Sequence, residues 1–97
     1  MYKSAHSHRV LFPNRKRRDH IMNSAEKTVT LLKILARKPY VYGVTELGEK
    51  IGCGKSGTFK LLNVLVQEGL AAQTPEHKYT LGMVSYLLGK CYEDHVG

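Results

Sequence analysis

Hydrophobic residues recur with helical spacing over residues 24–38, which predicts the first helix of the chain. Ser24 is a suitable N-cap, and Pro39 stops the helix because the residue before a proline is driven out of the helical conformation. Leu31 and Ile34 widen the apolar face, so we expect this helix to be buried on more than one side or to pair with a second chain. The other apolar positions of the face are Ala25, Val29, Leu32, Leu35 and Ala36.

Two more helical segments follow at close spacing. Thr45 is placed as the N-cap of a short helix over residues 46–51, and residues 52–54 include two glycines that permit a sharp turn. The next helix covers residues 55–68, and its inner face is expected to consist of Thr58, Leu61, Leu62 and Leu65. Two helices joined by a short glycine-containing turn are typical of a helix-turn-helix.

The last part of the chain contains a hairpin and another helix. Residues 70–74 and 78–81 are expected to be strands, with a loop over residues 75–77. Residues 83–92 then show the spacing of an amphipathic helix, which runs into a polar end. The order helix, helix, helix, hairpin, helix predicts a mainly α fold with a small β-hairpin wing, which is a winged helix-turn-helix.

Positive charge is concentrated at the N-terminus. The formal net charge is +7, of which residues 1–23 contribute +5 (six Lys/Arg against one Asp) and the rest of the chain +2. We interpret residues 1–23 as a basic, poorly structured arm, residues 24–92 as the folded domain, and residues 93–97 as the start of a linker or the chain end. A basic arm suits the phosphate backbone of nucleic acids, and a solvated tail without a partner is an equally good interpretation.

The length and composition exclude several classes of function. Ninety-seven residues make one small domain with little room for a deep substrate pocket, and no catalytic motif stands out, so we expect no enzyme. His6 and His8 have no Cys or acidic partner at ligand spacing, and we expect neither a metal nor a cofactor. The chain has no apolar run long enough for a membrane span and no secretory signal, which predicts a cytoplasmic protein with free thiols at Cys53 and Cys91.

Five short motifs occur in a fixed order along residues 24–92. They are Leu-Leu-Lys-Ile-Leu-Ala (31–36), Val-Thr-Glu-Leu-Gly-Glu-Lys-Ile-Gly (44–52), Gly-Lys-Ser-Gly-Thr-Phe-Lys-Leu-Leu (54–62), Glu-Gly-Leu (68–70) and Lys-Tyr-Thr-Leu-Gly (78–82). With these motifs at these spacings, the chain resembles the N-terminal DNA-binding domain of IclR-type transcription regulators. The resemblance implies a homodimer that binds double-stranded DNA, and a C-terminal effector-binding domain that is missing from this sequence.

Three glycines depart from the family pattern. Gly48 stands where alanine is usual, Gly57 where threonine or a similar residue is common, and Gly54 where proline is frequent. The glycine at position 57 removes a side chain from the surface that would face DNA. The base preference at that position therefore does not carry over from the family.

Residues 55–68 form the predicted recognition helix, whose N-terminal end is expected to enter the major groove. Its lysines suit phosphates or guanine edges, and Asn63 suits adenine. Phe59 either contacts a thymine methyl group or belongs to the core, and Ser56 is expected to cap the helix. The wing tip would approach the minor groove or flanking phosphates, and the arm would track an adjacent minor groove. The candidate DNA-binding residues are Thr45, Lys55, Ser56, Gly57, Phe59, Lys60, Asn63, His77, Lys78, Arg15, Lys16, Arg17 and Arg18.

Two other functions stay open on the sequence alone. One is a winged-helix module whose recognition helix meets a protein partner, and the other is a non-specific nucleic-acid binder driven by the basic arm. Salt dependence separates the latter from a sequence-specific regulator, because specific binding keeps a sequence preference at salt concentrations that abolish purely electrostatic binding.

Overall fold

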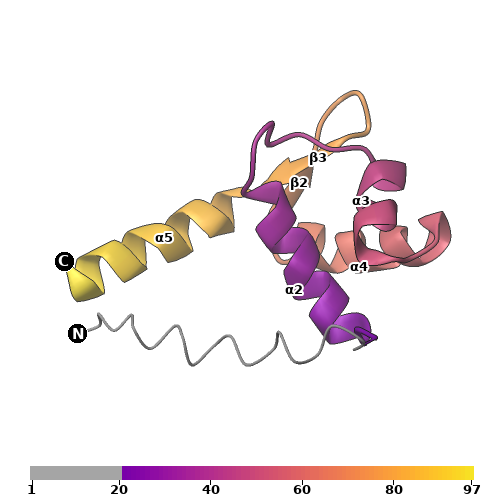
Figure 1. Ribbon diagram of the computed structural model, residues 1–97. Helices are drawn as coiled ribbons and strands as arrows, with labels where there is room; N and C mark the ends of the chain where they lie inside the picture. Colours follow the sequence, from indigo (N-terminus) through magenta and orange to yellow (C-terminus); the bar gives the residue numbers. More distant parts are fainter. Residues whose placement is uncertain (1–20) are drawn as a thin grey trace.

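The computed structural model describes residues 21–97, which form three packed helices, a two-stranded hairpin and a projecting fourth helix (Figure 1). The observed order confirms the predicted fold class, which is mainly helical with a small hairpin wing. The elements are α2 (Ser24–Leu35), α3 (Val44–Ile51), α4 (Lys55–Gln67), β2 (Ala71–Gln73), β3 (Tyr79–Leu81) and α5 (Met83–Val96).

The N-terminus of α2 is capped by Asn23, so the prediction of Ser24 as the N-cap is wrong. The Asn23 side chain accepts a hydrogen bond from the backbone N–H of Glu26, and the Glu26 carboxylate accepts one from the backbone N–H of Asn23, both at 2.9 Å. This reciprocal pair satisfies two backbone donors, which a serine at position 24 would not do. The helix ends at Leu35, earlier than predicted, because residues 36–40 form a turn ahead of the strand-like Tyr42.

The buried face of α2 is rotated from the face that the sequence indicated. Leu31, Ile34 and Leu35 are buried, whereas Ala25 and Val29 of the predicted stripe are exposed. The two residues that appeared to widen the stripe are therefore its centre. The core that they join also contains Tyr42, Leu47, Ile51, Leu62, Leu65, Ala71 and Tyr79.

Tyr42 ties the α2–α3 connection to the hairpin, a contact that the sequence did not predict. Residues 40–43 were expected to be only a turn, but Tyr42 and Tyr79 pair in an isolated β-bridge. Their backbone N–H groups donate to each other's carbonyl oxygens at 3.0 and 2.7 Å. The Tyr42 hydroxyl lies 2.8 Å from the carbonyl oxygens of both Arg37 and Lys38. The wing is thus fixed relative to the helices by backbone pairing as well as by core packing.

Helix α5 is anchored to the body at its first turn. The Ser85 hydroxyl donates to the carbonyl oxygen of Leu70 at 2.8 Å, and the backbone N–H of Val84 donates to that of Gly69 at 2.9 Å. Beyond this turn the helix projects away from the body (Figure 1). It continues to Val96, past the predicted end at residue 92, and none of its residues is buried. Among residues 21–97, every helix is too short or too polar to cross a bilayer.

Candidate nucleic-acid interface

The turn between α3 and α4 brings the two helices into direct backbone contact. A Cβ atom at Gly48 would lie 2.6 Å from the carbonyl oxygen of Cys53 and 2.9 Å from the Thr58 hydroxyl oxygen. The Thr58 hydroxyl is fully buried and donates to the carbonyl oxygen of Gly54 at 2.8 Å. Gly52 ends α3 in the left-handed conformation (φ 67°), which glycine adopts without steric cost. These contacts fix the angle at which α4 leaves α3.

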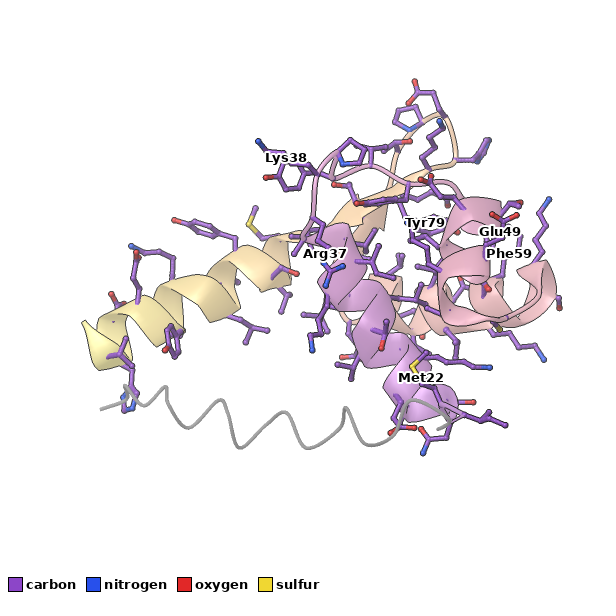
Figure 2. All side chains as sticks on the ribbon, in the orientation of Figure 1. Met22, Arg37, Lys38, Glu49, Phe59 and Tyr79 are labelled. Atoms are coloured by element: carbon purple, nitrogen blue, oxygen red, sulfur yellow. The ribbon has the colours of Figure 1, made fainter. Side chains whose placement is uncertain are left out.

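Helix α4 has one face in the core and one at the surface. Thr58, Leu62 and Leu65 are buried and Leu61 is half-buried, so the predicted inner face is confirmed. The predicted contact residues Lys55, Ser56, Lys60 and Asn63 are exposed. Phe59 is 37% exposed, and Figure 2 places it on the side of the helix pair that faces away from α2. The structure therefore brings these candidate side chains together on one outer surface.

The N-terminus of α4 presents backbone donors without a side-chain cap. Gly54 is the N-cap, so the prediction that Ser56 caps this helix is wrong, and Ser56 lies within the first turn. No acidic residue occupies that turn, while Lys55 begins it. Free N–H groups and the positive end of the helix dipole favour an anion at this position.

Thr45 lies within the first turn of α3 and is not its N-cap, contrary to the prediction. Gly43 takes the cap position in an extended conformation, and its N–H donates to the Glu46 carboxylate at 3.4 Å. The Thr45 side chain is therefore free of the capping role that was expected of it. It is exposed at the start of α3.

The wing tip is a tight turn that exposes His77 and Lys78. The backbone N–H of His77 donates to the Thr74 carbonyl oxygen at 2.8 Å, and that of Lys78 donates to the Thr74 hydroxyl at 3.1 Å. His77 adopts a positive φ of 64°, which is uncommon for a residue with a side chain. In Figure 1 the hairpin loop projects from the body on the side where α3 begins.

Tyr79 anchors the wing to the hydrophobic core. It is 2% exposed and extends from β3 into the interior beside α3 (Figure 2). Burial raises the pKa of its phenol above the ordinary value of 10.0, because the charged form would lose its hydration.

The predicted arm residues Arg15, Lys16, Arg17 and Arg18 lie outside the described residues. Within residues 21–97 no group of three His, Cys, Asp or Glu side chains is arranged to hold a metal ion.

The helix-turn-helix and the first strand match a known domain family. The IclR helix-turn-helix domain matches residues 24–75, which is more than half of the chain. The chain belongs to this family. It is thus an IclR-type DNA-binding domain of the kind found in transcription regulators.

Solved structures share the fold of this domain. HmgR from Pseudomonas aeruginosa superposes with a TM-score of 0.69 and 28% identity, over 76% of this chain and 32% of that protein. An IclR transcriptional regulator from Alicyclobacillus acidocaldarius gives a TM-score of 0.65 and 29% identity, over 69% of this chain and 28% of its own. This IclR-type chain therefore spans about a third of the length of these relatives. No curated protein matches it.

Two of the departures from the IclR pattern have a structural reason. Gly48 meets the Cys53 carbonyl oxygen and the Thr58 hydroxyl, which leaves no room for a methyl group. A Cβ atom at Gly57 would lie 2.9 Å from the Cys53 sulfur, so the thiol occupies the space beside that position. Gly54, by contrast, has open space around it.

Proposed function

We propose that this IclR-type domain reads duplex DNA by placing the N-terminal half of α4 in the major groove. The division of α4 into one buried and one exposed face supports this proposal most directly. Its inner face holds the core together while the outer face presents cationic, amide and aromatic groups to solvent. A helix anchored in this way can enter a groove as a rigid body.

The side chains on the outer face suit different parts of the duplex. Lys55 and Lys60 are matched to phosphates or to the O6 and N7 acceptors of guanine, and Asn63 to the N6 and N7 atoms of adenine. Ser56 and the uncapped N–H groups around it suit a phosphate. Phe59 offers an apolar surface to a thymine methyl group. His77 and Lys78 of the wing, Thr45 and the basic arm would add contacts to the backbone or minor groove.

A selection from randomised duplexes, followed by titration of variants, tests the recognition helix. Asn63→Ala should cost about 1–3 kcal/mol of affinity for the selected duplex and relax its preference at one base pair. Gln67→Ala is the matched control, because Gln67 is an exposed amide one turn further from the N-terminus of α4. Equal affinity and preference for the Asn63→Ala and unmodified domains would refute the assignment. Failure to select any duplex would favour a protein-interaction module instead.

Deletion of residues 1–21 tests the role of the basic arm. If the arm contacts phosphates, its removal should weaken binding to all duplexes and reduce the steepness with which affinity falls with salt. If it is a solvated tail, both quantities stay unchanged. The selected base preference should be the same in either case, because the arm would supply affinity rather than specificity.

We also propose that the domain forms a homodimer through α5. Apolar side chains along α5 are 49–70% exposed, among them Tyr86, Leu87, Leu88 and Tyr92. A projecting helix with so much exposed apolar surface is typical of a protein–protein contact. Light scattering at micromolar concentration should give a dimer, and Leu87→Glu with Leu88→Glu should give a monomer. Lys90→Glu is the control, because Lys90 forms only an exposed pair with Glu93 at 3.5 Å. A monomeric mass for the unmodified chain would refute the proposal.

We also propose a further domain and a location in the cell. The solved relatives are about two and a half times as long as this chain, which supports an effector-binding domain acting together with this one. A cytoplasmic location fits a protein that works on DNA. Fractionation and mass measurement of the native protein test both expectations.

A further inference from the structure

A cleft between α2 and α3 is lined by three cations. Its volume is about 340 Å³, and its walls are Thr30, Lys33, Ile34, Arg37 and Lys50. Thr30, Lys33 and Ile34 recur at i, i+3 and i+4 on one face of α2, Arg37 follows in the turn after that helix, and Lys50 reaches the cleft from α3. Ile34 is 7% exposed and belongs to the core. The cleft thus has polar and cationic walls beside a buried apolar residue.

The acidic residues of the neighbouring helices do not neutralise this cleft. Within residues 21–97, Lys33, Arg37 and Lys50 form no ion pair with a carboxylate. The Glu26 carboxylate accepts from the backbone of Asn23, and that of Glu46 accepts from Gly43. Figure 2 shows Glu49 far from Arg37, on the other side of α3. Three uncompensated cations converging on one cavity form a local field that attracts anions.

We propose that the α2–α3 cleft is an anion site that binds phosphate groups through Lys33, Arg37 and Lys50. A guanidinium and two ammonium groups supply many donors and no acceptor, and the Thr30 hydroxyl can donate one more, which suits phosphate oxygens. The volume is within the range of small-ligand sites, so a diphosphate fits as well as a backbone phosphate of DNA. Figure 2 shows Arg37 far from Phe59, so this site is separate from the outer face of α4.

A purely structural role for these cations makes a different prediction. Lys33 and Lys50 lie in the last turns of α2 and α3, where positive charge offsets the helix dipole. In that case their removal would lower the stability of the domain but would not change its binding of any anion. The experiment therefore has to measure binding, with thermal unfolding as a separate readout.

Titration of the 97-residue chain with pyrophosphate at low salt, followed by NMR of the backbone amides, tests the proposal. We expect saturable shifts concentrated at Thr30, Lys33, Arg37 and Lys50. The Arg37→Gln/Lys50→Gln double variant should weaken pyrophosphate binding roughly tenfold. Each exposed charge contributes up to about fivefold in affinity, so the two together account for this loss. Lys38→Gln with Lys90→Gln removes the same charge outside the cleft and should leave the affinity within about twofold. Shifts spread over all cationic residues and weakened equally by both double variants would overturn the proposal.

Titration with duplex DNA distinguishes the two sources of phosphate. If the site takes a DNA phosphate, the Arg37 and Lys50 double variant should bind all duplexes more weakly, with the salt slope reduced by about 1–2 and the base preference unchanged. If it takes a free anion, duplex affinity stays unchanged while pyrophosphate binding is lost. Loss of neither would overturn the proposal. The Asn63→Ala result does not bear on this site, so the two proposals fail independently.

Discussion

Substitution of Gly48 by alanine tests whether the α3–α4 contact sets the shape of the domain. Helix propensity alone favours alanine over glycine by about 1 kcal/mol inside a helix. At Gly48, however, the new methyl carbon would lie 2.6 Å from the carbonyl oxygen of Cys53, which belongs to the backbone and cannot rotate away. Relief requires a movement of about 1 Å in the turn, and overpacking of this kind costs about 1–3 kcal/mol. We therefore expect a net loss of stability of up to about 2 kcal/mol, and a Gly48→Ala domain about 1–3 kcal/mol less stable than the propensity gain alone would make it.

Thermal and urea unfolding followed by circular dichroism measure this effect at one fixed protein concentration. For a domain of this size, a loss of 1 kcal/mol corresponds to a decrease in Tm of about 4–8 °C. Gly89→Ala is the control, because a Cβ atom at Gly89 meets nothing within 4 Å and it too lies inside a helix. That variant should be as stable as the original chain or more stable. A Gly48→Ala domain that gains the full value of about 1 kcal/mol expected from helix propensity would show that the close backbone approach does not constrain the fold.

Three further predictions concern the turn, the wing and the core. Gly57→Ala should stabilise the domain by about 0.5–1 kcal/mol more in a Cys53→Ala background than beside the native thiol, because the new Cβ atom would lie only 2.9 Å from the Cys53 sulfur. Additive free energies of unfolding in the double-mutant cycle would contradict this coupling. His77→Gly should stabilise the domain by about 1 kcal/mol, because φ is 64° there, and yet weaken duplex binding; a destabilised variant would exclude backbone strain at the wing. Burial raises the pKa of Tyr79 above 10.0, so its contribution to the free energy of unfolding is fully present below pH 10 and is lost as pH rises through the folded-state pKa. Tyr79→Phe should therefore reduce the alkaline loss of stability measured by urea unfolding at several pH values. An unchanged pH profile would assign that loss to other groups.

The elements of the fold were predictable because their patterns are local. The inner face of α4 followed from the spacing of Thr58, Leu62 and Leu65, and it is buried as expected. The hairpin followed from two short segments around Pro75. The helix caps were less predictable. The observed N-caps are Asn23, Gly43 and Gly54, and each precedes the predicted cap (Ser24, Thr45 and Ser56) by one or two residues. Several side chains can cap a helix, and tertiary packing decides which residue comes last before it.

The remaining features depend on contacts between distant residues. The bridge between Tyr42 and Tyr79 joins positions 37 residues apart, and no local sequence pattern predicts it. The rotation of α2 depends on which face meets α4, because both faces are apolar in sequence. Two cations of the α2–α3 cleft are close in sequence, since Lys33 lies in the last turn of α2 and Arg37 in the turn that follows, but Lys50 joins them only through the tertiary fold. The DNA-contact residues stay predictions, because surface exposure is necessary for contact but does not demonstrate it.

Gly57 affects how this domain would divide its DNA-binding energy between base contacts and phosphate contacts. Gly57 provides no side chain on the outer surface of α4, and the space beside it is taken by the Cys53 thiol. Direct base reading would then rest on Phe59, Lys60 and Asn63, so fewer base pairs are discriminated than with a full row of contacts. A larger share of the affinity would have to come from phosphates, for which the chain has a basic arm and the cations near the wing and the α2–α3 cleft. Because each neutralised phosphate adds about 0.9 to the salt slope, a domain organised in this way should show steep salt dependence together with modest sequence preference.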